Sequence, residues 1–509
     1  MKRISLIALI ALAFGIGIAA TTPSAQAGLF GGKQSGTPSP SPSPSALPTA
    51  SPEPPSVAIP RLAAKLKANP TDQLTMAQLA AEYLQVNRPD IAVQYTQHLL
   101  QLGDKTAQVF YYDALAQEQL GNGGGALNDL EEASNLDPTN LNVLASLADL
   151  YIRANRQNDA ERIARRAVTF NKTDPGALMT LGSVYAAEQH YDDARAQFEA
   201  AFALNPKDPA PIFQIATTYA QQNNISMALQ TIARALAIDP RNIQALVFKA
   251  DLYARQHDDA HTTEAYDDAV VAAPTDDQKV AIMIRKAAYF VQEKKDAQAV
   301  AIFQQITQTF PKVATGFAAY GDYYASVRQY DRATVQWQAA LGVDPNNAAA
   351  LLGLGEVSMQ GGRLNDSISY LRHYTQVSPD AQGFAILGQA YSRVRDYSGA
   401  RDACGKSFEI QRSPATLSCV AGADFELRNY KEAAQIFDVL NSGAHGFLDA
   451  NPPLLYMAAK AYASSNQCSK AVAAYKRLLP MMKKGTKDYA MVVKAAAGPC
   501  KSPATKHSG

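Results

Sequence analysis

The chain has 509 residues, of which 47% are hydrophobic and 18% are charged, and its formal net charge at pH 7 is +1. This balance excludes the strong basic excess that binding to nucleic acid or to an anionic membrane surface requires. We therefore expect extensive apolar burial beneath a surface of mixed charge.

The first 27 residues have the composition of a secretory signal peptide. Two basic residues precede an apolar run over 4–20, and Ala25-Gln26-Ala27, with its two small residues, forms a cleavage site. A retained membrane anchor is the alternative, but the run is short for a membrane span. Gly28 stands where a bacterial lipoprotein would need cysteine. We predict a cleaved signal over 1–27, periplasmic or extracellular export, and no stable membrane insertion afterwards.

Residues 28–60 are predicted to form a disordered spacer rich in proline and serine. Nine prolines occur in the 24 residues from Thr37 to Pro60. This composition favours extended polyproline II and does not build a core. A proline-rich ligand for another domain and a glycosylated stalk are the alternatives.

From Asp72 onward the sequence repeats with a period close to 34 residues. Every unit carries Ala, Gly, Ser or Thr at positions 8 and 20 and a large apolar residue at position 4. Small residues at fixed places indicate that two helices approach closely there. The units begin at 73, 107, 141, 175, 209, 243, 280, 314, 348, 381, 414 and 452.

Each unit contains the pattern of two helices. Apolar residues recur at positions 4, 7, 8 and 11 and again at 20, 24, 27 and 28, the spacing of amphipathic helices of about three turns. Position 11 is aromatic in nine units, which would let a hydroxyl reach a polar edge. Strand alternation is absent, and we predict an all-α fold.

This pattern resembles the tetratricopeptide repeat over residues 72–480. The resemblance implies an α-solenoid superhelix of about twelve helical hairpins over 61–482, with a concave inner face. Residues 483–509 are predicted to add a capping helix over Lys487–Ala497 and a basic tail. A short helix over Arg61–Lys67 is expected at the other end, and Asn441–Pro453 is expected to be an extended surface loop.

The four cysteines test this register, because sequence alone allows three pairings. Cys404 and Cys419 are equally far from the turn between two consecutive antiparallel helices, so they should face each other. Cys468 lies at the turn of the last hairpin, beside the expected end of the capping helix and Cys500. We predict the pairs Cys404–Cys419 and Cys468–Cys500, with four reduced core cysteines as the alternative.

Motifs for catalysis, cofactors and metals are weak. Gly405-Lys406-Ser407 lacks the preceding glycine of a phosphate-binding loop, because Ala400 stands there. His257 and His261 are expected in a turn and lack the order of a zinc-binding helix. The remaining segments are too short for a separate catalytic domain. We predict no enzymatic activity, no cofactor and no metal site.

In proteins that resemble this family, positions 5 and 9 of the first helices tend to face the groove. Here they are mostly apolar with scattered acids, and the Lys and Asn of the chaperone-tail clamp are missing before Lys460. Packing between adjacent repeats is the alternative role. We predict that a partner segment binds there through Tyr111, Met179 and Phe213, with basic contacts to Asp149, Asp251, Asp322 and Glu356.

The leading functional hypothesis is a non-catalytic scaffold or adaptor in the periplasm or cell envelope, with a protein or peptide partner in the groove. An enzyme subunit or hydrolase built into the solenoid is the first alternative, although the catalytic residues that it requires are not evident in the sequence. An exported solute-binding or glycan-binding protein is the second.

Overall fold

The computed structural model describes residues 53–443 and 446–498. These residues form 26 α-helices and one 3-10 helix, with no strand among them. They fall into two compact units, an N-terminal unit that ends at Pro274 and a C-terminal unit that begins at Thr275. The predicted signal peptide and most of the predicted spacer lie outside the described residues.

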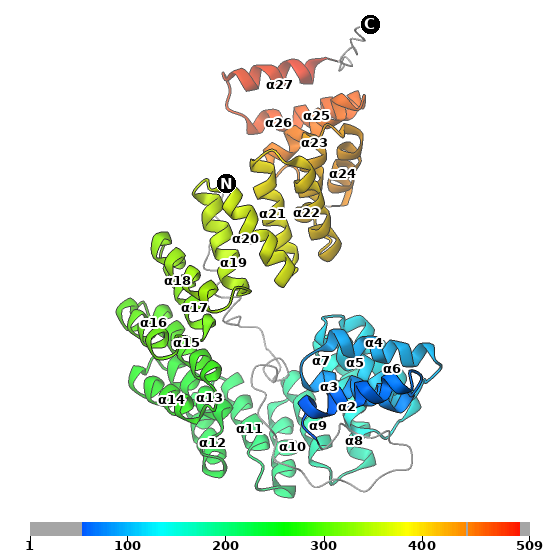
Figure 1. Cartoon of the computed structure of the whole chain (residues 1–509), viewed down its shortest axis with the longest axis vertical. Helices are drawn as coiled ribbons and strands as arrows, with labels where there is room; N and C mark the ends of the chain where they lie inside the picture. Colours follow the sequence, from blue (N-terminus) through cyan, green and yellow to red (C-terminus); the bar gives the residue numbers. More distant parts are fainter. Residues whose placement is uncertain (1–52, 444–445, 499–509) are drawn as a thin grey trace. The chain divides into compact units, whose positions relative to one another are not determined.

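Each of the two compact units contains six consecutive helical hairpins, one hairpin for each sequence repeat. The predicted all-α architecture of twelve hairpins is therefore confirmed (Figure 1). The helices of the N-terminal unit are α2 Pro55–Ala68, α3 Gln73–Gln85, α4 Pro89–Gln101, α5 Ala107–Gln119, α6 Gly123–Leu136, α7 Leu141–Arg153, α8 Gln157–Phe170, α9 Pro175–Ala187, α10 Tyr191–Leu204, α11 Ala210–Gln221, α12 Ile225–Ile238, α13 Ile243–Arg255 and α14 Asp259–Ala272.

The helices of the C-terminal unit follow the same alternation of first and second helices. They are α15 Asp276–Gln292, α16 Asp296–Thr309, α17 Ala314–Ser326, α18 Tyr330–Val343, α19 Ala348–Gln360, α20 Leu364–Val377, α21 Ala381–Arg393, α22 Tyr397–Ile410, α23 Pro414–Glu426, α24 Tyr430–Gly443, α25 Pro452–Ser464, α26 Cys468–Leu478, η2 Leu479–Met481 and α27 Lys487–Ala497.

The first helix of each hairpin begins close to the residue that the repeat predicts. Ten of the twelve start at that residue, α11 starts one residue later, and α15 starts four residues earlier. The residue before the helix often caps it, as when Asp72 accepts a hydrogen bond from the backbone N–H of Thr75. Such caps satisfy N–H groups that have no partner within the helix.

Small residues bring the two helices of a hairpin together, as predicted. Ser367 at position 20 donates a 2.7 Å hydrogen bond to the carbonyl oxygen of Gly355 at position 8. A Cβ atom on Gly182, also at position 8, would lie 2.5 Å from the ring of Phe198. The small side chains therefore leave the space that large residues of the facing helix fill.

The hairpins all turn with one backbone geometry. In each of the twelve repeats the residue at position 15 has a positive φ, between 55° and 81°. Only two of these residues, Gly121 and Gly362, are glycines. The other ten residues hold a left-handed conformation in which a Cβ atom is unfavourable.

The C-terminal end is covered as predicted. Helix α27 spans the expected residues, and Thr486 caps it by accepting a hydrogen bond from the N–H of Tyr489. Val492 and Ala496 are buried in the apolar core of the last hairpins. The capping helix thus covers apolar surface that the last repeat would otherwise expose.

At the other end, the predicted spacer is shorter than expected. Helix α2 begins at Pro55 rather than at Arg61, so six residues assigned to the spacer are helical. Proline is tolerated at the first helical position, because its missing N–H would have no partner there. The alternation of proline hid this helix, which is stabilised by burial of Ala58 and Leu62 against Leu79.

The predicted surface loop of residues 441–453 is partly packed instead. Helix α24 continues to Gly443, and Leu448 is 2% exposed within the core of the last hairpins. The glycines and asparagines suggested a solvated loop, but burial of this apolar residue holds the connection against the helices. Among the described helices, none combines the length and apolar character that crossing a membrane requires.

Candidate protein-interaction surfaces

The apolar part of the predicted groove lies in the N-terminal unit. Tyr111 on α5, Met179 on α9 and Phe213 on α11 are partly buried against one shared apolar core. The ring of Phe213 lies 5.2 Å from the ring of Phe248 on α13. Burial also raises the pKa of Tyr111. These residues pack between hairpins and retain part of their surface for contact with another molecule.

Two of the four predicted acids, Asp149 and Asp251, have partners within their own hairpins that occupy their carboxylates. An Oδ2 atom of Asp149 on α7 lies 3.0 Å from Nη2 of Arg153, one turn further along the helix. Asp251 on α13 accepts a 2.6 Å hydrogen bond from the hydroxyl of Tyr266 on α14. Both acids therefore stabilise their own hairpins, which reduces their share in attracting a basic partner.

The other two acids lie on first helices of consecutive hairpins in the C-terminal unit. Trp337 donates a 2.9 Å hydrogen bond from Nε1 to Oδ1 of Asp322 on α17. Burial raises the pKa of Asp322 to about 6. On α19, burial and then the negative charge of Asp322 raise the pKa of Glu356. Within the described chain, neither carboxylate forms an ion pair with lysine or arginine.

The seven predicted groove residues therefore divide into two sets. The apolar residues and two internally bonded acids belong to the N-terminal unit, whereas Asp322 and Glu356 belong to the C-terminal unit. They form two candidate surfaces, one in each compact unit.

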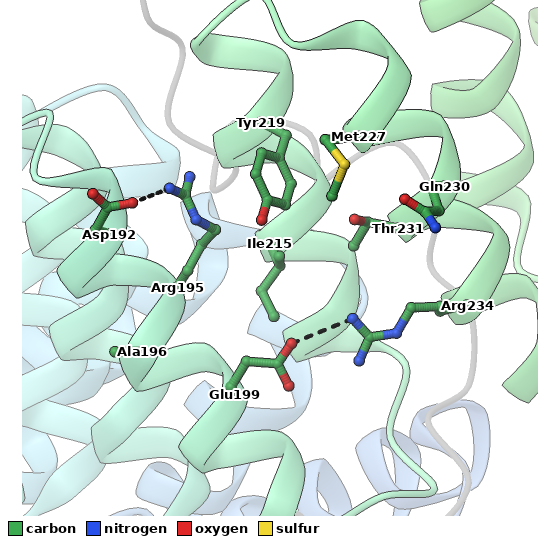
Figure 2. A pocket seen from close by; sticks show the side chains of 10 residues that line it. All are labelled: Asp192, Arg195, Ala196, Glu199, Ile215, Tyr219, Met227, Gln230, Thr231 and Arg234. Carbon is green, nitrogen blue, oxygen red and sulfur yellow. Dashed lines mark hydrogen bonds and ion pairs between the residues drawn. The ribbon is translucent and has the colours of Figure 1, made fainter.

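The N-terminal unit also contains a cleft, lined by α10, α11 and α12, that the repeat pattern did not predict. A space of about 460 Å³ is lined by α10 on one side, by α12 on the other and by α11 in the middle (Figure 2). Arg195 forms an ion pair with Asp192, and Nη1 of Arg234 lies 3.3 Å from Oε1 of Glu199. The cationic residues of this cleft are thus paired with its own carboxylates.

Arg195 is further held by neighbouring groups. Its Nη1 atom donates a 2.7 Å hydrogen bond to Oε1 of Gln222. Its guanidinium lies 4.4 Å from the centre of the Tyr219 ring, within the range of a cation–π contact. Figure 2 shows Arg195 between Asp192 and Tyr219. The guanidinium of Arg195 therefore has its polar partners within the protein.

A second cleft occupies the equivalent place of the repeat in the C-terminal unit. It measures about 310 Å³ and is lined by α20 on one side, by α22 on the other and by α21 in the middle. Leu387 and Tyr391 stand at positions 7 and 11, like Ile215 and Tyr219 in the first cleft. The lining residues are Arg372, Thr375, Gln376, Phe384, Leu387, Tyr391, Gly399, Asp402, Ala403 and Lys406.

Sequence reasoning missed both clefts because the family resemblance directed attention to positions 5 and 9. The sequence does contain a feature that marks both clefts: charged residues stand at position 25 of one repeat and at position 26 of the next repeat. These residues are Glu199 with Arg234 and Arg372 with Lys406.

A disulfide bond joins Cys404 on α22 to Cys419 on α23, with the Cα atoms 5.5 Å apart. This is the pairing expected from the repeat register. Gly388 leaves room for it, because a Cβ atom there would lie 2.7 Å from Sγ of Cys404. Cys468 is also disulfide-bonded, and its predicted partner Cys500 lies outside the described residues.

Two family models match segments of the chain. Residues 128–246 match the C-terminal ARM domain of tetratricopeptide repeat protein 21, and residues 319–382 match the tetratricopeptide repeat. Neither model describes an enzyme. No curated protein matches the sequence.

Solved structures with similarity to this chain include three with the following values. Yeast Tom70 is 15% identical, with a TM-score of 0.38, and the match covers 74% of this chain and 93% of Tom70. MamA is 19% identical, with a TM-score of 0.26 and coverages of 31% and 93%. YrrB, described as a TPR protein with an unusual peptide-binding site, is 23% identical, with a TM-score of 0.29 and coverages of 36% and 95%.

Proposed function

Since the chain is a helical-repeat protein of the tetratricopeptide type, we propose that it is a non-catalytic scaffold that binds a protein or peptide segment. The observation that supports this most is the row of Tyr111, Met179 and Phe213, all at position 5 of first helices in one unit. These large side chains remain only partly buried. Aromatic and methionine side chains at such places are suited to anchoring a partner.

The charge of the C-terminal unit favours a partner segment with basic residues. Asp322 and Glu356 carry no lysine or arginine partner within the described chain. A basic side chain brought near them would lower the cost of ionising both half-buried carboxylates. Basic residues of the partner are therefore expected to contact Asp322 and Glu356 rather than Asp149 and Asp251.

Export of the protein is part of the same proposal. It rests on the sequence of residues 1–27, and the Cys404–Cys419 bond is compatible with an oxidising compartment. N-terminal sequencing of the protein from a periplasmic or culture fraction should begin at Gly28. Recovery of the uncleaved chain from the cytoplasm would contradict export without affecting the scaffold assignment.

The scaffold assignment is tested by capturing partners from the envelope fraction with the mature chain and identifying them by mass spectrometry. A variant with Tyr111→Ala, Met179→Ala and Phe213→Ala should lose the captured partner while keeping its helical circular dichroism. The matched control is Phe170→Ala, which removes an aromatic ring that is 51% exposed at the end of α8. Equal capture by both variants would overturn the assignment of this row.

A further inference from the structure

The two equivalent clefts differ in the pairing of their cations. In the α10–α12 cleft, Arg195 and Arg234 each form an ion pair with a carboxylate of the same cleft. In the α20–α22 cleft, Arg372 on one wall and Lys406 on the other form no ion pair with any carboxylate of the described chain. In the first cleft the basic side chains are thus neutralised by carboxylates of the cleft itself, whereas in the second cleft they remain available to bind an anionic group.

The surroundings of the two open cations favour an anionic group with apolar neighbours. The ammonium group of Lys406 lies 5.5 Å from the centre of the Phe384 ring, which holds its stem along the cleft. Arg372 shares its wall with Thr375 and Gln376. The guanidinium can bind a carboxylate through two hydrogen bonds, and the side-chain amide of Gln376 can donate another. The hydroxyl of Thr375 already donates a 3.0 Å hydrogen bond to the carbonyl oxygen of Arg372.

Charge and shape together define the occupant. Asp402 is the only acid among the lining residues, so the two basic residues leave a net positive lining. The apolar side chains of Leu387 and Tyr391 lie between the two walls. A phosphate or a free carboxylate would satisfy the charge, but only a peptide with alternating acidic and apolar side chains would also cover this apolar floor.

We propose that the α20–α22 cleft is a second binding surface, which takes an acidic peptide segment of a partner protein. An aspartate or glutamate of the segment binds between Arg372 and Lys406, and a neighbouring apolar side chain packs on Leu387 and Tyr391. Its charged residues lie on the second helices α20 and α22 and its apolar floor on α21, and it prefers the opposite charge to the Asp322–Glu356 pair. It is therefore independent of the surface proposed above.

The test is a fluorescence-polarisation titration of the full mature chain with a labelled ten-residue peptide of alternating glutamate and leucine. We expect saturable binding that is at least about tenfold tighter than that of a matched glutamine–leucine peptide. Arg372→Gln combined with Lys406→Gln should remove this advantage. The control is Arg195→Gln combined with Arg234→Gln in the equivalent cleft, which should change binding less than about twofold.

A second variant separates charge from folding. Exchanging the two cations, by Arg372→Lys with Lys406→Arg, keeps the charge of the cleft and should retain most of the binding. The proposal is overturned if both peptides bind equally or do not bind, or if the control variant loses as much affinity as the Arg372 and Lys406 variant. Loss of binding in the Tyr111, Met179 and Phe213 variant would also contradict it, since that surface is separate.

Discussion

The surroundings of Trp337 show why the repeat requires small residues. This ring is 3% exposed, and a Cβ atom on either Gly321 or Gly353 would lie 2.5 Å from it. Glycine is the poorest helix former after proline, so its presence in α17 and α19 needs a compensating reason. The reason is space, because the burial of a tryptophan contributes more than the helix propensity of alanine.

We therefore expect Gly321→Ala to lower the free energy of unfolding by about 1–3 kcal/mol through overpacking. Gly342→Ala in the neighbouring helix α18 is the matched control, because a Cβ atom there meets nothing within 4 Å. The control should be neutral or stabilising by up to about 1 kcal/mol. Urea unfolding measures both, and equal effects would refute the packing explanation.

The hydrogen bond between Trp337 and Asp322 provides an optical signal for a titration. The pKa of Asp322, about 6 in the folded protein, lies above its ordinary value of 3.8 because burial disfavours the carboxylate. The folded state thus binds this proton more tightly than the unfolded state does. The contribution to stability is present below about pH 4 and is lost as the pH rises to about 6.

Trp337 is the only tryptophan of the chain, so its emission reports this site alone. We expect the emission to change with a midpoint near pH 6, and we expect Asp322→Asn to abolish the change. Asp331→Asn, at an exposed residue of α18, should leave the midpoint in place. A transition that survives in Asp322→Asn would assign the titration to another group.

At the scale of the element, the turn within each hairpin combines a regular backbone with an irregular sequence. Position 15 has a positive φ in every unit, yet the residues there include Arg328 and Lys294. Glycine and asparagine, the residues that adopt this geometry most readily, occupy position 15 in only half of the repeats, so residue type alone does not predict it. It is imposed by the packing of the two helices on either side.

This geometry predicts opposite effects for two substitutions in adjacent hairpins. Gly362→Ala should destabilise the protein by about 1 kcal/mol, because alanine adds a Cβ atom at positive φ. Arg328→Gly should stabilise it by up to about 1 kcal/mol, partly offset by the greater freedom of the unfolded chain. Thermal unfolding tests both signs, and a loss of stability in Arg328→Gly would contradict the strain.

Two tyrosines at position 11, Tyr151 and Tyr462, connect their hairpins to the preceding ones. The hydroxyl of Tyr151 donates a 2.7 Å hydrogen bond to Glu131, and the hydroxyl of Tyr462 donates a 3.0 Å bond to Asp438. Both acids stand at position 25 of the preceding unit. The sequence predicted a polar partner for these hydroxyls, but only the stacking of hairpins decided which residue it is.

At the scale of the whole molecule, the ends are critical, because a repeat protein is stabilised by contacts between neighbouring elements. Val492 and Val493 on α27 are adjacent in sequence, but their exposed fractions are 2% and 40%. Val492→Asp places a charge in the core of the last hairpins, which should detach α27 and destabilise this end.

Hydrogen exchange measures this effect along the chain. We expect Val492→Asp to reduce protection of α25, α26 and α27, with little effect in the N-terminal unit. Val493→Asp should leave the protection of all three helices nearly unchanged. Loss of protection throughout the chain would show that the two units unfold together rather than from this end.

The repeat period carried most of what could be predicted about the fold. It predicted all twelve hairpins, because the required small and large residues recur in every repeat. The C-terminal helix lies beyond the last repeat and was predicted from its own apolar spacing. The division after Pro274 coincides with a 37-residue step of the repeat, from 243 to 280. That longer step marks the division in the sequence, although the repeat pattern as a whole predicts one solenoid.

By itself, the sequence determined the helical hairpin, its register and the expected pairing of Cys404 with Cys419, because these depend on contacts between residues close in the chain. Only the tertiary structure decided the partners of the acids and the two clefts. Asp149 and Asp251 are held within their hairpins, whereas Arg372 and Lys406 face the cleft and form no ion pair with a carboxylate of the part of the chain that the structure describes. Such differences depend on side-chain directions across neighbouring helices, which residue type and spacing do not specify.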